Sequence, residues 1–146
     1  MQKRYYVDSC IWLNLFKKEG DASKGKPYWQ IAEEFIEKVI SSQDAEIIYS
    51  PIILREIENK LDKKLFNEAV SSIENEPKFM LIKIEEEDYG MARKFECASK
   101  YSLSFYDCLN MAVCIRLKFI LITRDKKLLE FARWYLIAEK PESVLI

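Results

Sequence analysis

The segment Phe119-Ile-Leu-Ile-Thr-Arg-Asp125 decides the fold of this chain. Its first four residues form a continuous apolar run, which is typical of a strand buried on both faces of a parallel sheet. Asp125 follows at once, and the residues from there to Trp134 have the spacing of a short helix. The segment therefore predicts a buried strand that ends in an acidic residue at the start of a helix.

The same arrangement opens the chain. Tyr5–Val7 is short and apolar, Asp8 follows it, and apolar residues spaced by three and four predict a helix through Phe16. The loop Glu19–Pro27 contains two of the three glycines. Ser50-Pro51 is a favourable helix start, with serine as the N-cap and proline at the first helical position. Further strands are expected at residues 47–49, 79–84 and 143–146, and further helices at 28–41, 51–61, 64–74, 86–101 and 105–117.

Strands that alternate with helices and read as continuous apolar runs indicate an α/β fold. We expect a three-layer sandwich with a central, mostly parallel sheet of about four to five strands flanked by helices. The length of 146 residues predicts a single domain, residues 1–146. The composition, 49% hydrophobic and 32% charged, is that of a globular protein. The net charge of -1 means that any nucleic-acid contact must come from a local basic patch.

The sequence also indicates where the protein acts. Its longest apolar runs are far too short to span a membrane, and its opening residues show no signal-peptide pattern. Four cysteines are present without a C-x-x-C pair, and Cys108 and Cys114 lie in an apolar helical pattern that predicts core positions. We therefore expect a protein of the reducing cytoplasm, without membrane contact, disulfides or a structural zinc site.

Four acidic residues lie just after a strand or in the first two turns of a helix, each in a different segment of the chain. Asp8 and Asp125 directly follow strands, Glu56 lies in the second turn of the helix after the second strand, and Asp107 lies in the first turn of the helix before the last apolar strand. Ligands of parallel α/β sheets bind beyond the carboxyl ends of the strands, where these four acids can converge. The chain contains no histidine, so a hard divalent cation bound through oxygen is the natural counter-charge.

Each acid also has an ordinary structural interpretation. Asp8 and Asp125 fit helix N-caps, and Ser104 with Asp107 fits a capping box. Glu56 fits the solvated face of an amphipathic helix. The acidic run Glu85–Asp88 fits a helix start, where acids favour the helix dipole, better than it fits a metal site.

Four motifs in order resemble the PIN-domain nucleases, the family that includes the VapC-type toxins of bacterial and archaeal toxin–antitoxin modules. They are Y-Y-V-D-S-C-I-W-L, S-P-I-I-L-R-E-I, F-Y-D-C-L-N-M-A and I-L-I-T-R-D, and the resemblance covers essentially the whole chain. It places the acidic tetrad of the family on Asp8, Glu56, Asp107 and Asp125, and supporting hydroxyls on Ser9 and Thr123.

The resemblance implies a metal-dependent endoribonuclease that cuts RNA to leave a 5′ phosphate and a 3′ hydroxyl. Mg2+ or Mn2+ would be the cofactor, held by Asp8, Asp125, Asp107 and Glu56. Asp8 and Asp125 would bind the metal directly, Asp107 directly or through water, and Glu56 would orient the attacking water or bind a second ion. The implied partners are an RNA substrate, an antitoxin protein and a second copy of the chain in a homodimer.

Local positive charge is needed to hold an RNA backbone. Candidates beside the last acid are Arg124, Lys126 and Lys127, and candidates after the first helix are Lys17 and Lys18. Trp12 and Tyr106 fit either core packing or stacking on a base.

Other functions stay open on the sequence. One is a housekeeping PIN nuclease for RNA processing, and another is a catalytically silent PIN module that binds RNA or a protein. An aspartate-based phosphotransfer domain would have Asp-x-Asp or an acidic pair at its first strand, and this chain has Asp8-Ser9-Cys10 there.

Overall fold

The computed structural model describes residues 2–145. Its strands are β1 (Lys3–Val7), β2 (Ala45–Tyr49), β3 (Phe79–Leu81), β4 (Ile120–Ile122) and β5 (Ala138–Glu139). Its helices are α1 (Ser9–Phe16), α2 (Tyr28–Ser41), α3 (Pro51–Lys60), α4 (Lys63–Glu74), α5 (Glu86–Ala98), α6 (Phe105–Leu117), α7 (Lys126–Ala132) and α8 (Pro141–Leu145). A short 3-10 turn, Ala22–Lys24, lies in the loop between α1 and α2.

The sheet has five parallel strands in the order β3-β2-β1-β4-β5. Tyr5 of the central strand β1 pairs with Ile47 on one side and with Ile120 on the other. The predicted α/β class is confirmed. Because β1 and β4 are neighbours in register, with Val7 opposite Ile122, the residues that follow them emerge side by side at one edge of the sheet.

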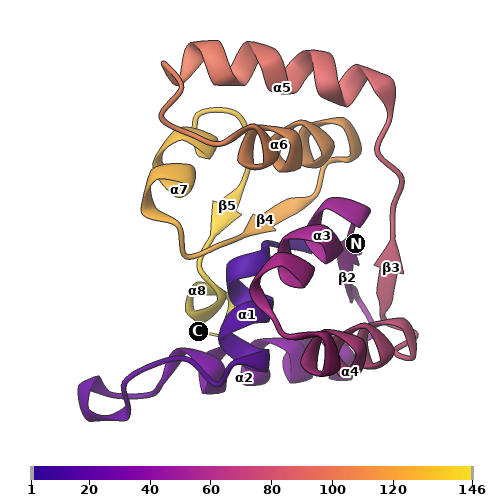
Figure 1. Ribbon diagram of the computed structural model, residues 1–146, viewed down its shortest axis with the longest axis vertical. Helices are drawn as coiled ribbons and strands as arrows, with labels where there is room; N and C mark the ends of the chain where they lie inside the picture. The colour runs from indigo at the N-terminus through magenta and orange to yellow at the C-terminus, as the bar shows by residue number, and fades with distance from the viewer. Residues whose placement is uncertain (1, 146) are drawn as a thin grey trace.

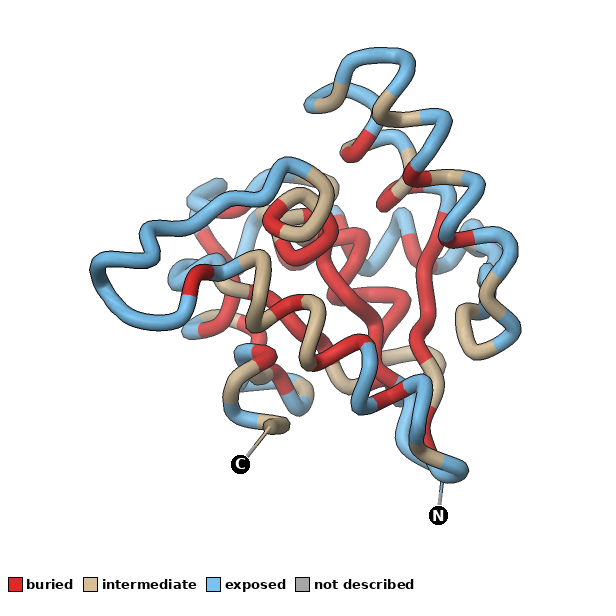
Figure 2. Tube along the Cα trace, turned by 90° about the horizontal axis from the view of Figure 1, so that it is seen from below, coloured by how far each residue is buried: buried red, intermediate tan, exposed pale blue. Residues whose placement is uncertain are grey.

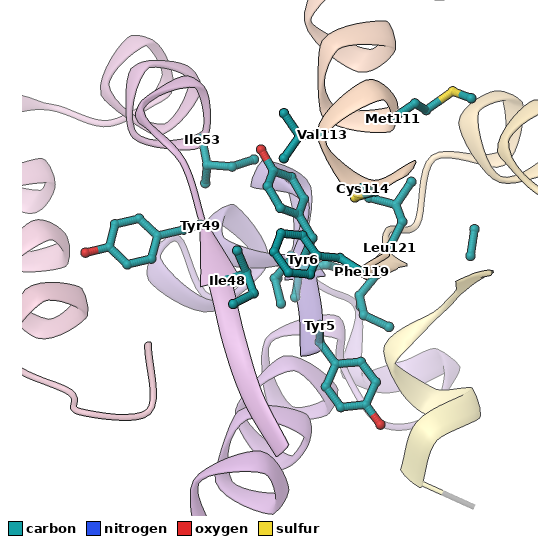
Figure 3. Packing of buried hydrophobic residues seen from close by; sticks show 14 of the residues in the cluster. Tyr5, Tyr6, Ile48, Tyr49, Ile53, Met111, Val113, Cys114, Phe119 and Leu121 are labelled. Carbon is teal, nitrogen blue, oxygen red and sulfur yellow. The ribbon is translucent and has the colours of Figure 1, made fainter. Parts of the chain in front are cut away.

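Helices cover both faces of the sheet (Figure 1). The two tyrosines at the centre of β1 point to opposite faces, because successive side chains of a strand alternate (Figure 3). Tyr5 packs edge-on against Phe35 of α2, with ring centroids 5.4 Å apart. Tyr6 is fully buried, stacks on Phe119 at 6.4 Å and bonds to Asn110 of α6. The central strand is thus covered by α2 on one face and by α6 on the other.

The helices α5 and α6 pack side by side as an antiparallel pair (Figure 1). Asp88, at the start of α5, accepts hydrogen bonds from Nε and Nη2 of Arg116 in α6, at 2.8 and 2.9 Å. Asp88 also accepts from the amide of Glu85 at 2.8 Å and completes a capping box. The acidic run at residues 85–88 is therefore a helix start, as the sequence predicted, and α5 ends at Ala98, before the expected Tyr101.

The last strand was predicted in the wrong place. Residues 143–145 belong to α8, and Ile146 lies outside the described residues. The fifth strand is β5, which pairs Ala138 with Leu121. A strand of two residues is too short to leave a periodic pattern, and Pro141 is favourable at the first position of a helix. The strand expected at 79–84 is also shorter and ends at Leu81.

The buried residues follow the central strands and the inner sides of the helices, and the loop between α1 and α2 is exposed from Lys17 to Lys26 (Figure 2). Cys108 and Cys114 are buried core residues, as predicted, and all four cysteines are free thiols. Among residues 2–145 no helix combines the length and the apolar character that a bilayer crossing needs.

Candidate acidic metal centre

Asp8 lies at the centre of the candidate site, at the carboxyl end of the middle strand. Its backbone amide donates to the carbonyl of Ile122 in β4 at 2.9 Å, which fixes the end of β1 against β4. Its side chain caps α1 by accepting from the amide of Ser9 at 2.8 Å. The structural role as an N-cap, which the sequence left open, is therefore real. Asp8 is 4% exposed, and burial raises the pKa of its carboxyl group.

Thr123 joins the ends of β1 and β4. Its hydroxyl donates to Oδ2 of Asp8 at 2.7 Å, and it accepts from the amide of Asp125 at 3.1 Å. Asp125 is exposed and caps α7 through the amide of Leu128 at 3.2 Å. One buried hydroxyl thus connects two of the four acids and supports their positions.

Glu56 and Asp107 come from α3 and α6, on the side of the sheet that Tyr6 faces. Burial, with smaller contributions from the charges of Asp8 and Asp107, raises the pKa of Glu56 to about 7. Burial likewise raises the pKa of Asp107 to about 6, with contributions from Asp8 and Asp125. Burial is the larger cause of both shifts, and the like charges of the neighbouring carboxylates add to it.

The site lacks a protein counter-charge. In residues 2–145 no lysine or arginine nitrogen lies within 4 Å of a carboxylate oxygen of Asp8, Glu56, Asp107 or Asp125. The side chains that support the cluster are hydroxyl, thiol and amide groups. Four carboxylates without a basic partner repel one another, and a bound cation would relieve that repulsion.

The donor set fits a hard divalent ion in its chemistry, since all four candidates are carboxylates and no soft or imidazole ligand competes. The four carboxylates are, however, spaced more widely than the ligands of a closed metal site. Within the described chain no three acidic or cysteine side chains stand close enough to hold an ion as they are. Mg2+ usually keeps several waters and takes only one or two carboxylates directly, so it does not need a closed protein cage. The residues present therefore fit an ion held partly through water.

A buried hydrogen-bond chain behind Glu56 escaped the sequence interpretation. The hydroxyl of Tyr6 lies 2.7 Å from that of Ser50 and donates to Oδ1 of Asn110 at 2.6 Å. The amide of Asn110 then donates to Glu56 at 3.5 Å, the long limit of such a bond. All three supporting residues are fully buried. Ser50 is at the N-cap position of α3, as predicted, but its side chain makes no capping bond.

The sequence contained signals for this chain of residues. Asn110 is a polar residue in an apolar helical stretch, three positions after Asp107 and so on the same helix face. Tyr6 is two positions before Asp8 and so on the same side of the strand. No sequence pattern marked Cys10 as part of the candidate site. Its thiol nevertheless lies 3.6 Å from Oδ2 of Asp8 and 3.5 Å from the hydroxyl of Thr123.

The basic residues predicted to hold RNA are in different situations. The guanidinium of Arg124 is turned away into an ion pair with Glu142, 2.9 Å long, and stacks over the ring of Tyr28 at 4.1 Å. Lys17 lies 3.9 Å from Glu19, and Lys18 lies over Trp29. Lys126 and Lys127 directly follow Asp125. Both are exposed, and neither has an ion-pair partner within residues 2–145. Trp12 is buried in the core, with its indole N–H on the carbonyl of Val7.

These features define the class of protein, a parallel α/β domain with an acidic site at the carboxyl ends of its central strands. The profile of the PIN domain matches residues 5–133, and the chain belongs to the PIN-domain family. The resemblance inferred from the four motifs is thereby confirmed. No curated protein sequence matches the chain significantly.

Solved structures with the same fold include several toxin–antitoxin proteins. VapBC2 from Rickettsia felis, bound to a DNA fragment from its promoter, aligns with a TM-score of 0.70 and 17% identity over 94% of this chain and 98% of that chain. VapC20 from Mycobacterium tuberculosis, a toxin that cleaves the sarcin-ricin loop, aligns with a TM-score of 0.67 and 14% identity over 91% of this chain and 96% of that chain. A toxin–antitoxin complex from Klebsiella pneumoniae aligns with a TM-score of 0.58 and 20% identity over 84% of this chain and 88% of that chain. At these identities the likeness establishes the shared fold.

Proposed function

We propose that this protein is a metal-dependent endoribonuclease and that Asp8, Glu56, Asp107 and Asp125 are its catalytic acids. One observation carries the proposal. Acids from four separate segments lie toward the carboxyl ends of β1 and β4, and burial, with a smaller contribution from like charges, raises the pKa values of Asp8, Glu56 and Asp107, while no basic side chain lies within 4 Å among residues 2–145. An arrangement that costs folding energy in this way is typical of a site kept for its chemistry.

Mg2+ or Mn2+, when bound, would lower the pKa of a water and neutralise the charge that builds up on the phosphoryl oxygens. Asp8 and Asp125 are the proposed direct ligands, and Thr123 holds the two in a fixed relation. Asp107 would bind directly or through water. Glu56, with a pKa of about 7, is suited to accept a proton from the attacking water near neutral pH. Lys126 and Lys127, which are exposed and directly follow Asp125, would contact the RNA backbone.

The biological role we propose is that of a toxin with a cognate antitoxin. Family membership and the toxin–antitoxin proteins among the structures of the same fold support this role. We further propose a homodimer that acts on RNA in the cytoplasm. Sedimentation of the purified chain tests the dimer, and a small gene for a DNA-binding antitoxin directly upstream would support the role.

The enzymatic proposal is tested by incubating mixed RNA with the protein in Mg2+ or Mn2+, with and without EDTA. We expect cleavage that needs the metal and falls by at least about 100-fold in Asp8→Asn, which keeps the N-cap but removes the charge. Asp62→Asn is the control, since Asp62 is also a helix N-cap, of α4, and accepts from the amide of Leu65 away from the site. Cleavage in EDTA, or full activity of Asp8→Asn, would contradict the mechanism.

A catalytically silent PIN module that binds RNA is the second candidate. The observation in its favour is the loose spacing of the acids in the described chain. Absence of cleavage with every RNA and metal tested, combined with intact RNA binding, would favour it over the nuclease.

A further inference from the structure

A cavity of about 450 Å3 lies between the start of α3 and the helices α5 and α6. Two basic and two aromatic side chains line it, namely Arg55, Lys83, Tyr89 and Tyr106. Apolar side chains, among them Ile52 and Leu109, complete the lining, and no acidic residue takes part. Its volume is in the range of small-molecule sites. The lining combines the groups that bind a base and a phosphate.

The cavity adjoins the acidic site through two helices. Arg55 directly precedes Glu56 on α3, and Tyr106 directly precedes Asp107 on α6. Successive residues of a helix are about 100° apart around the axis, so each helix turns one residue to the acids and its neighbour to the cavity. A group bound in the cavity would therefore contact the same two helices that carry Glu56 and Asp107.

The positive charge of the cavity is available. The side chains of Arg55 and Lys83 are exposed, and neither has an ion-pair partner in the described part of the chain. The start of α3 also faces the cavity, where Pro51 and Ile52 line it. The side chain of Ser50 makes no capping bond to this helix, and its hydroxyl lies 2.7 Å from that of Tyr6. The positive end of the helix dipole adds to the two side chains and favours an anion.

The aromatic surface is available too. Tyr106 is half-buried, and in residues 2–145 its ring stacks on no other aromatic ring. Tyr89 is 47% exposed and packs against Phe105 with centroids 6.3 Å apart, which holds it in place on α5. Stacking of a base on an aromatic side chain is a common basis for binding single strands.

We propose that this cavity binds one unpaired nucleotide of the RNA, with its base against Tyr106 and its phosphate between Arg55 and Lys83. The inference deepens the proposed function, on which it rests for the choice of RNA. It specifies single-stranded RNA, because a base in a helical stack cannot present its face to a tyrosine. The bound nucleotide would place a neighbouring phosphodiester next to Glu56 and Asp107.

The test measures binding of a fluorescently labelled mixed-sequence RNA 10-mer by anisotropy in Mg2+, in the Asp8→Asn background so that the probe stays intact. We expect Tyr106→Ala to weaken binding about 10-fold and Tyr106→Phe to bind like the parent, because stacking does not need the hydroxyl. Arg55→Ala and Lys83→Ala should each lower the slope of log affinity against log salt by about 0.7. Lys3→Ala is the control, since Lys3 lines a separate cavity at the amino ends of the strands.

Parent-like binding by Tyr106→Ala and by the double variant Arg55→Ala/Lys83→Ala would overturn the inference. So would a loss of binding that accompanies a change in oligomeric state by sedimentation, because the cavity would then be a subunit interface. The two proposals fail separately. If the wild type cleaves RNA and the cavity variants bind RNA like the parent, only the cavity proposal is contradicted. If RNA binds through the cavity and no RNA is cleaved, only the nuclease proposal is contradicted.

Discussion

Acidic side chains gather in two places in this molecule, and the two places differ in what balances their charge. At the start of α5, Asp88 is buried and receives two hydrogen bonds from Arg116 and one from the amide of Glu85. Toward the carboxyl ends of β1 and β4 lie four acids, more loosely spaced, and none has a basic partner within 4 Å in the described chain. Sequence density of acids is higher in the first place, yet the second is the candidate site.

The two clusters differ in whether the protein itself supplies the positive charge that the carboxylates need. The cluster at α5 is complete, because its charge and its hydrogen bonds are satisfied within the protein and serve to join α5 to α6. The candidate cluster is incomplete, because its carboxylates have no basic partner among the described residues and burial together with like charge raises the pKa values of Glu56 and Asp107. An incomplete cluster stabilises the fold only when a ligand supplies the missing positive charge.

The largest contrast is expected when one acid of each cluster becomes an amide. Asp88→Asn should lower the free energy of unfolding by about 2 to 3 kcal/mol, because it leaves the guanidinium of Arg116 without its partner. Asp107→Asn should not destabilise the metal-free protein at pH 7.5, because it removes a repelling charge. Urea denaturation in EDTA measures both. Equal destabilisation by the two substitutions would contradict the distinction between the clusters.

The second contrast concerns pH. Glu56 has a pKa raised from 4.5 to about 7 in the folded protein, so the folded state binds its proton more tightly than the unfolded state does. The associated stability is fully present below pH 4.5 and is lost as the pH rises through 7. Glu56→Gln cannot lose a proton and should gain stability relative to the wild type between pH 5 and 8 in EDTA. A difference that stays constant across this range in urea midpoints would contradict the raised pKa.

The smallest effect on RNA cleavage is expected from the buried residues that support Glu56. Asn110→Ala removes the amide that reaches Glu56 and should reduce RNA cleavage by about 10-fold, at the low end for outer supports of a metal centre because the contact is long. Tyr6→Phe removes only the hydroxyl behind Asn110 and should have a smaller effect on cleavage. Thermal melts of both variants separate a loss of activity from a loss of folding. Full activity of Asn110→Ala in a folded protein would remove this residue from the account.

Much of the fold was predictable from local patterns. Tyr5–Val7 and Phe119–Ile122 have the apolar runs of buried parallel strands, and the structure places them side by side at the centre of the sheet. The fifth strand was not predictable, since Ala138–Glu139 has only two residues and is defined by pairing with β4. The helix at Pro141–Leu145 was mistaken for a strand because a short apolar run has no distinct period.

The candidate site was predictable only in part, for a related reason. Asp8, Glu56, Asp107 and Asp125 could be chosen from the order of the family motifs, in which two acids follow strands and two lie in the first or second turn of a helix. Their supports depend on contacts between distant segments, such as the 104 positions that separate Tyr6 from Asn110. The state of Arg124 was hidden for the same reason, because its partner Glu142 lies in a helix that the sequence did not predict.

Binding of Mn2+ tests the central claim, that the four acids form one cation site, most directly. Loss of the free Mn2+ signal in electron paramagnetic resonance reports binding without RNA and without catalysis. We predict that the wild type binds Mn2+, that Asp8→Asn and Asp107→Asn each weaken binding at least about 10-fold, and that Asp88→Asn and Asp62→Asn bind like the wild type. Undiminished Mn2+ binding by both Asp8→Asn and Asp107→Asn would contradict the account.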